Sequence, residues 1–113
     1  TRHMIASPQF SLMKPTAILI NTARGPVVDE RALLDALRNR KIAGAGLDVF
    51  EQEPMVEKGL ESLDQVVLLP HIGSATVEAR TGIAMTAIRN VTAVLQGRRP
   101  PNPVVIPEKR IGR

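Results

Sequence analysis

Apolar residues along the chain occur in two patterns, as short continuous runs and as runs with helical spacing. Three continuous runs predict strands, and they cover residues 17–22 (AILINT), 42–50 (IAGAGLDVF) and 66–70 (VVLLP). Each run is short and largely apolar, and proline, glycine or charged residues follow it and end the strand. We therefore predict three buried strands.

Helical spacing is found between and around these runs. Residues 28–41 place three leucines on one face, and Asp29 is suited to cap the start of this helix. A longer helix is predicted from the N-cap Thr76 to about Leu95, where apolar residues again recur at helical spacing. A short helix is expected over residues 7–14.

The order of these elements favours an α/β fold. Strands that are apolar almost throughout are typical of a parallel sheet that is covered on both faces. Three strands make a thin sheet for a doubly wound fold, so we expect the chain to be the C-terminal portion of a longer protein.

Composition narrows the possible chemistry. The 113 residues include no cysteine and only two histidines, His3 and His71, so neither a disulfide nor a metal site is predicted. The aromatic residues are two phenylalanines, which is too few for a base-stacking surface. The net charge of +4 permits a weak polyanion patch in the basic tail, although an ordinary solvated tail is favoured. No nucleic-acid partner is expected.

The hydropathy of the chain indicates where in the cell the protein is expected. No apolar run approaches the roughly 18 residues that a membrane-spanning helix requires. A secretory signal is not recognisable either, so a cytoplasmic protein without a membrane partner is expected.

Polar side chains follow all three predicted strands. Arg24 comes after the first strand, Asp48 and Glu53 come after the second, and His71 comes after the third. The carboxyl ends of parallel strands meet at one edge of a sheet, and ligands bind at this edge. Each residue also has an ordinary interpretation, as a loop arginine, solvated acids and a loop histidine, and spacing alone leaves both interpretations open.

These residue types suit one kind of reaction. An arginine binds a carboxylate through two parallel hydrogen bonds. A histidine carries protons near neutral pH, and a neighbouring glutamate stabilises its protonated form. Together they suit the reduction of a 2-oxo acid, for which a cofactor must supply the hydride.

Three segments resemble consecutive signatures of the D-isomer-specific 2-hydroxyacid dehydrogenases. They are ILINTARGPVVDERALLDAL, GAGLDVFEQEP and LLPHIGSAT, and the resemblance covers essentially the whole chain. The ending LQGRRPPNPVV is most similar to the glyoxylate/hydroxypyruvate reductase and 2-ketogluconate reductase branch. The resemblance implies reduction of a small 2-oxo acid to the D-2-hydroxy acid with NAD(P)H.

The resemblance also implies roles for individual residues. Arg24 binds the carboxylate and carbonyl of the substrate, His71 is the acid/base, and Glu53 is the glutamate paired with that histidine. The residues implied to line NAD or NADP are Thr22, Ala23, Arg24, Asp48, His71 and Gly73. Glu51 falls at a variable position of its motif and is expected to face solvent, and His3 is given no chemical role.

The family organisation implies two parts. Residues 1–76 form the second half of a Rossmann-type NAD(P)-binding domain, and residues 77–113 form a helix and a proline-rich tail that return to a substrate domain. The Gly-rich pyrophosphate loop is not among the 113 residues, so we expect the fragment alone to be inactive. A homodimer is implied for the full-length protein. The alternative function is an NAD(H)-binding transcriptional corepressor, because corepressors that share this fold can keep the same three motifs.

Overall fold

The computed structural model describes residues 1–104, and residues 105–113 of the proline-rich tail lie outside the described residues. The chain divides into two compact units, unit 1 (Thr1–Gly73) and unit 2 (Ser74–Arg113). All three strands lie in unit 1, and the long helix lies in unit 2.

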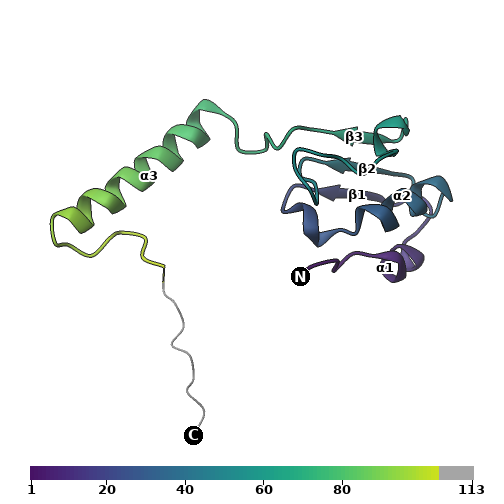
Figure 1. The fold of residues 1–113 in the computed structure, drawn as a ribbon, viewed down its shortest axis with the longest axis horizontal. Coiled ribbons are helices and arrows are strands. Elements are labelled where there is room, and N and C mark those ends of the chain that lie inside the picture. Colours follow the sequence, from purple (N-terminus) through teal and green to yellow (C-terminus); the bar gives the residue numbers. More distant parts are fainter. Residues whose placement is uncertain (105–113) are drawn as a thin grey trace, which may run out of the picture. The chain divides into compact units, whose positions relative to one another are not determined.

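Unit 1 is built on a three-stranded parallel sheet with the order β1-β2-β3 (Figure 1). The strands are β1 (Ile18–Asn21), β2 (Gly44–Leu47) and β3 (Val66–Leu68). The predicted parallel α/β sheet is therefore confirmed. The last residues of the three strands are aligned in register, Asn21 with Leu47 and Leu47 with Leu68. The three loops that follow them consequently start at one edge.

Two helices and two 3₁₀ turns complete unit 1. The helices are α1 (Ser7–Leu12) and α2 (Glu30–Arg38), and the 3₁₀ turns are η1 (Gly25–Val27) and η2 (Leu60–Ser62). Asp29 caps α2 as predicted, since its side chain accepts a hydrogen bond from the Ala32 N–H at 2.9 Å. This cap fixes where α2 begins, directly after the loop that follows β1.

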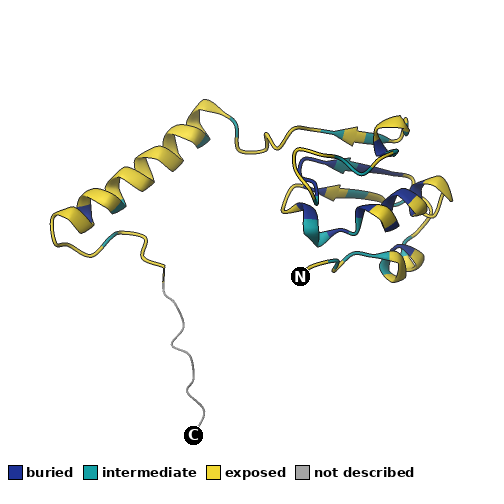
Figure 2. Cartoon of the chain, in the orientation of Figure 1, coloured by how far each residue is buried: buried dark blue, intermediate teal, exposed yellow. Residues whose placement is uncertain are grey.

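The hydrophobic core lies between the helices and one face of the sheet (Figure 2). The leucines that the helical spacing places on one face of α2 are all buried, namely Leu33, Leu34 and Leu37. They pack with Phe10 of α1, Leu47 of β2 and Leu60 of η2. This packing holds the sheet edge against α2.

The opposite face of the sheet carries apolar side chains that unit 1 leaves exposed. Ile18 and Ile20 of β1 are 66% and 65% exposed, and Val67 of β3 is 61% exposed. Strands that are apolar on both faces are typical of a sheet with two covering layers. Unit 1 itself supplies the layer on one face only.

Unit 2 contains one long helix, α3 (Val77–Leu95). Thr76 caps it as predicted, because its hydroxyl oxygen accepts from the Ala79 N–H at 3.1 Å. Most of its side chains are exposed, and Ala93 is the buried residue of the helix. No helix among residues 1–104 is long and apolar enough to cross a membrane.

Candidate active site

The loop after β1 is shaped by Asn21, whose side chain is buried. Its Nδ2 donates to the carbonyl of Arg24 at 3.0 Å, and its Oδ1 accepts from the Ala23 N–H at 3.1 Å. A buried amide that is bonded at both ends fixes the turn between these residues. The turn leaves Thr22, Ala23 and Arg24 exposed beyond the sheet.

Gly25 brings this loop against the loop that follows β2. A Cβ atom at Gly25 would lie 1.9 Å from the backbone carbonyl carbon and oxygen of Phe50. No other residue fits, since real Cβ contacts are far longer. The Arg24 loop and the DVFEQEP loop are therefore in backbone contact.

Asp48 joins the loop after β2 to the loop after β3. Asp48 is 3% exposed, and its carboxylate accepts from two successive amides, Ile72 N–H at 2.8 Å and Gly73 N–H at 2.7 Å. The preceding residue, His71, has a φ of 55°, a left-handed conformation that side-chain-bearing residues rarely adopt. Asp48 thus stabilises the left-handed backbone conformation in which the His71 side chain reaches Glu53.

Glu53 and His71 form a hydrogen-bonded pair. His71 Nδ1–H donates to Glu53 Oε2 at 2.9 Å, and the Phe50 N–H donates to the other oxygen at 3.1 Å. The His71 hydrogen bond holds the pKa of the Glu53 carboxyl below its ordinary value. The Phe50 N–H and the charge of Arg24 act in the same direction. Glu53 is consequently a carboxylate at neutral pH, and the proton of a neutral His71 lies on Nδ1.

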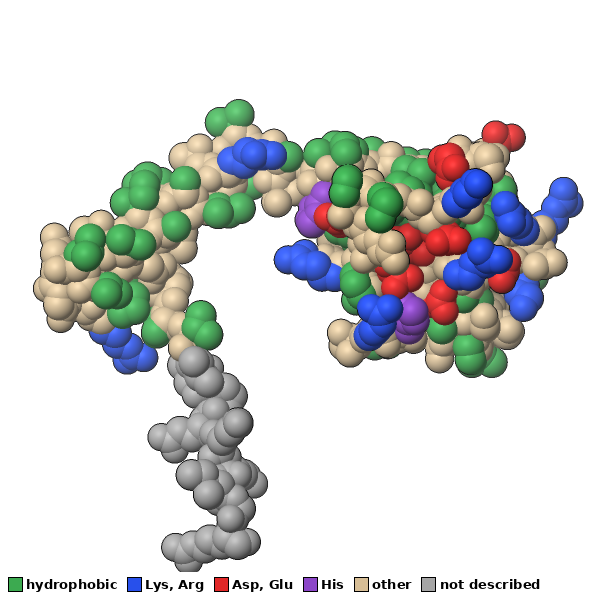
Figure 3. Space-filling view, in the orientation of Figure 1, with side chains coloured by type: hydrophobic (Ala, Val, Ile, Leu, Met, Phe, Trp, Pro, Cys, Tyr) green, Lys and Arg blue, Asp and Glu red, His purple; other side chains and the backbone are tan. Residues whose placement is uncertain are grey.

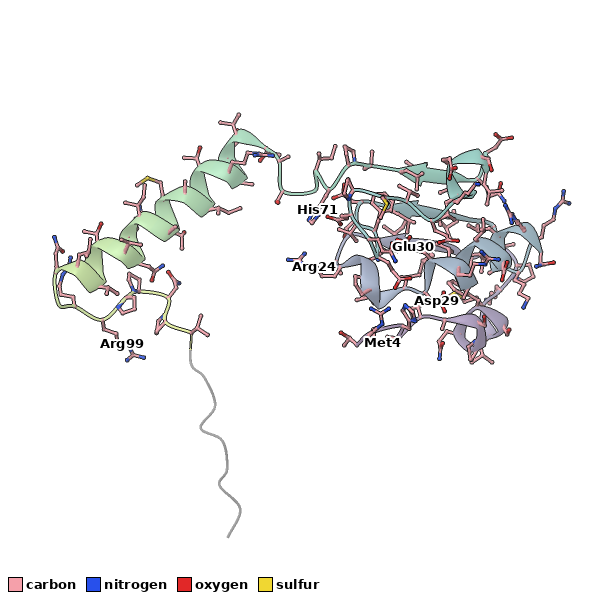
Figure 4. All side chains as sticks on the ribbon, in the orientation of Figure 1. Met4, Arg24, Asp29, Glu30, His71 and Arg99 are labelled. Atoms are coloured by element: carbon pink, nitrogen blue, oxygen red, sulfur yellow. The ribbon has the colours of Figure 1, made fainter. Side chains whose placement is uncertain are left out.

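Arg24 lies at the same edge of unit 1 as His71 (Figure 4). Its Nη1 donates to the Ala23 carbonyl at 2.7 Å, and within residues 1–104 it forms no ion pair with a carboxylate. Most of its five N–H donors are therefore available to a bound anion.

An apolar cavity of about 320 Å³ lies beside the Glu53–His71 pair. Most of its lining is hydrophobic, and it comprises Phe50, Pro54, Val56, Leu68, Leu69 and Pro70, with Glu53 and His71 at the polar end. The cavity borders the pair on one side only, because 46% of the His71 side chain and 37% of the Glu53 side chain remain exposed.

The structure brings Arg24, Glu53 and His71 together at the sheet edge. Thr22 and Ala23 precede Arg24 in the exposed loop after β1, and Gly73 follows His71 in the loop after β3. Asp48 lies nearby but is almost completely buried, and both of its oxygens bind the His71 loop.

The solvent position expected for Glu51 is wrong. Its Oε1 lies 2.6 Å from His3 Nε2, and its Oε2 accepts from the Glu30 N–H at 3.3 Å. Figure 3 shows acidic side chains gathered in the middle of the visible face of unit 1. The variable position of Glu51 in its motif gave no sign of these contacts, because the partners of Glu51 lie far away along the chain.

The sequence also contained no indication that Glu30 and His3 would contact Glu51. Glu30 reads locally as an ordinary acid in the first turn of a helix, yet it is only 4% exposed. His3 was given no role, and it pairs with Glu51. Both contacts depend on the tertiary structure, because His3 and Glu51, for example, are 48 residues apart in the sequence.

The comparison with family models decides the identity of the fold. Residues 1–73 match the model described as D-isomer specific 2-hydroxyacid dehydrogenase, NAD binding domain. The chain belongs to this family. The matched residues coincide with unit 1, which contains all three strand-end loops of the candidate site.

Curated relatives from this family are similar over most of the chain. A glyoxylate reductase of Thermococcus onnurineus is 59% identical over 101 residues, which are 89% of this chain and 30% of the relative. A glyoxylate/hydroxypyruvate reductase B of Enterobacter agglomerans is 58% identical over 99 residues, 87% of this chain and 31% of the relative. The chain thus spans about 30% of the length of the relatives that it matches.

Solved structures of the family share the fold. The NADPH-dependent glyoxylate/hydroxypyruvate reductase of Sinorhizobium meliloti, in complex with NADP and malonate, has a TM-score of 0.87 at 42% identity. The match covers 91% of this chain and 32% of that one. A D-lactate dehydrogenase of Lactobacillus jensenii with NAD+ has a TM-score of 0.82 at 32% identity, covering 94% and 36%.

Proposed function

We propose that the protein containing this chain reduces a small 2-oxo acid of the glyoxylate or hydroxypyruvate type to the D-2-hydroxy acid, with NADH or NADPH. The observation that carries the proposal is the 2.9 Å Glu53–His71 pair at the same sheet edge as Arg24. The family membership and the names of the relatives support the same reaction.

Arg24 is proposed to bind the substrate. Its guanidinium is exposed and its backbone is held by Asn21, so the planar donor group is presented from a fixed loop. A 2-oxo acid offers a carboxylate oxygen and the adjacent carbonyl oxygen, which match two parallel N–H donors. Binding there orients the carbonyl and polarises it.

His71 is proposed to donate the proton. Glu53 holds Nδ1, so Nε2 is the ring nitrogen available to the substrate. The Glu53 carboxylate stabilises the imidazolium before transfer. When Nε2 gives its proton to the carbonyl oxygen, the ring becomes neutral and keeps its Nδ1 proton on the hydrogen bond to Glu53.

The residues fit the nicotinamide end of a dinucleotide. Thr22 and Ala23 are small and exposed at the carboxyl end of β1, so a flat ring can approach the backbone closely. NAD(P)H supplies the hydride that, with the proton from His71, completes the reduction of the carbonyl. Asp48 and Gly73 are proposed on the cofactor side, and Asp48 also stabilises the His71 loop.

Further parts of the proposal concern the full-length protein. Residues 1–76 belong to the cofactor domain, and residues 77–113 return to a substrate domain. The protein is a cytoplasmic homodimer without nucleic-acid or membrane partners, which size-exclusion chromatography and fractionation would test. The comparisons give no support to the corepressor alternative.

Turnover by the full-length protein tests the proposal. Purified, folded protein is mixed with NADH or NADPH and with glyoxylate, hydroxypyruvate or larger 2-oxo acids, and oxidation of the nicotinamide is followed by absorbance. We expect oxidation that depends on the 2-oxo acid. Absence of oxidation with every 2-oxo acid, in a sample shown to be folded, contradicts the proposal.

A further inference from the structure

Glu30 is a buried acid that the proposed reaction does not use. It begins α2, and its carboxylate accepts from the Glu51 N–H at 2.8 Å and from the Glu57 N–H at 3.3 Å. Burial raises its pKa from the ordinary value, and the two backbone hydrogen bonds oppose that rise. A buried carboxylate is tolerated when such hydrogen bonds satisfy it. Glu30 belongs to α2, and these two bonds attach it to the loop after β2.

The contact between α2 and this loop is reciprocal. The Glu51 side chain contacts the start of α2, where its Oε2 accepts from the Glu30 N–H at 3.3 Å. Its other oxygen lies 2.6 Å from His3 Nε2. Each of the two glutamates therefore binds the backbone of the other, which fixes residue 51 relative to α2.

The same stretch of backbone also holds Glu53. The Phe50 N–H donates to Glu53 Oε1 at 3.1 Å, and the next amide, that of Glu51, donates to Glu30. On the other side, Gly25 lies in contact with the Phe50 carbonyl. The peptide between Phe50 and Glu51 is thus confined from two sides. The Phe50 N–H lies in the preceding peptide, one Cα away, so a displacement of residue 50 also displaces this donor.

We propose that Glu30 is a positioning residue for the Glu53–His71 pair, acting through the Phe50–Glu51 backbone. Glu30 anchors the Glu51 N–H, this anchor orients the adjacent Phe50 N–H, and that donor fixes the Glu53 carboxylate against His71. The catalytic consequence rests on the proposed function, whereas the structural link does not. Glu30 touches neither substrate nor cofactor in this scheme.

The Glu30→Gln variant of the full-length protein separates positioning from a simple charge effect. A glutamine replaces one of the two acceptor oxygens by an NH2 donor, so one of the two amides loses its acceptor and the turn loosens. A displaced Phe50 N–H no longer stabilises the Glu53 carboxylate, and the pKa of Glu53 rises toward its ordinary value of 4.5. Loss of a negative charge alone acts with the opposite sign, because it lowers the pKa of a neighbouring carboxyl.

The measurement is a carbon-detected NMR titration of the Glu53 carboxyl, together with steady-state kinetics. We expect the Glu53 pKa to rise and kcat to fall roughly tenfold with little change in KM, since catalytic groups lose rate when displaced. Glu61→Gln is the matched control, because Glu61 is exposed and its carboxylate interacts with nearby backbone amides, among them the Gly59 N–H at 2.8 Å. It should not raise the Glu53 pKa or lower kcat.

A Glu53 pKa that stays constant or falls in Glu30→Gln overturns the proposal, whatever happens to kcat. If Glu30→Gln does not fold, Glu30→Asp keeps the charge and retracts the carboxylate, and the same rise in the Glu53 pKa is required of it. The titration needs no turnover, so a protein that fails to reduce any 2-oxo acid refutes the proposed function and leaves this test intact.

Discussion

Unit 1 contains two histidine–glutamate pairs with similar geometry and different surroundings. His71 and Glu53 lie 2.9 Å apart, and His3 and Glu51 lie 2.6 Å apart. Both histidines have a positive φ, 55° for His71 and 50° for His3. Pair geometry alone therefore does not distinguish the two sites.

The second ring nitrogen distinguishes them. His3 Nδ1 lies 3.8 Å from an Asp29 carboxylate oxygen, so acids face both of its nitrogens. His71 Nε2 has no hydrogen-bond partner within the described part of the chain, and Arg24 lies at the same edge. The comparison indicates that the His71 pair is open for proton transfer, whereas the His3 pair joins the N-terminal segment to the loop after β2.

The largest expected effect comes from removing the open histidine. His71→Gln should lower kcat of the full-length protein roughly 100- to 10,000-fold, because a general acid contributes about that much. Steady-state kinetics with glyoxylate measures the change, and KM should move little. His3→Gln is the matched control and should keep kcat. Equal losses in the two variants contradict the distinction between the pairs.

The next effect concerns Arg24, which lies at the same edge as the His71 pair. Arg24→Ala should raise KM for the 2-oxo acid roughly 100-fold, since losing one partner of a charged hydrogen-bonded pair costs about 2–5 kcal/mol. Arg31→Ala removes an exposed arginine that lies 3.5 Å from Glu57 and serves as the control. Initial rates across a substrate series give both KM values, and an unchanged KM in Arg24→Ala refutes its binding role.

The two glutamates should differ in their effect on pH dependence. Glu53→Gln removes the charge that stabilises the His71 imidazolium, so the pH profile of kcat/KM should shift toward acid. Glu51→Gln keeps the Glu51 backbone N–H on Glu30 and should leave the profile in place. It should instead lower the free energy of unfolding by about 1 kcal/mol, as measured with urea. A shifted profile in Glu51→Gln would mean that the pairs are coupled.

The smallest effect is on stability at low pH. The pKa of Glu53 is lowered, so its ionised form stabilises the fold above the ordinary value of 4.5, and this contribution is lost as the pH falls through the lowered pKa. The pKa of Glu30 is raised, so its ionised form opposes folding above that raised value, and the penalty disappears as the pH falls toward 4.5.

Urea unfolding over a series of acidic pH values checks these opposite signs. The stability difference between wild type and Glu53→Gln should shrink below pH 4.5. The difference between wild type and Glu30→Gln should change in favour of wild type as the pH falls. Differences that change in the same direction would contradict the assignment of the two shifts.

Local patterns predicted much of the fold and the sheet edge at which Arg24, Glu53 and His71 lie, whereas the roles of these residues came from the family resemblance. Apolar runs located the three strands, and the rule that parallel strands end at one edge brought Arg24, Glu53 and His71 together. The caps Asp29 and Thr76 were also predictable, because capping depends on neighbours within one helical turn.

The environments of Glu30, which is buried, and of Glu51, which is partly buried, were not predictable from local patterns. Glu30 and Glu51 are 21 residues apart, and each is satisfied by the backbone of the other. Glutamate is mostly exposed in proteins, so composition and spacing favour solvent for both residues. Their burial depends on how α2 packs against the loop after β2, a contact that no short window of the sequence contains.

The most direct test of the central claim is the product formed from hydroxypyruvate and NADPH or NADH by the full-length protein, resolved by chiral chromatography. We predict the D-hydroxy acid from wild type and from His3→Gln, and only trace product from His71→Gln. Formation of the L-hydroxy acid, or equal product from His71→Gln and wild type, would contradict the assignment of His71 as the proton donor of a D-2-hydroxyacid dehydrogenase.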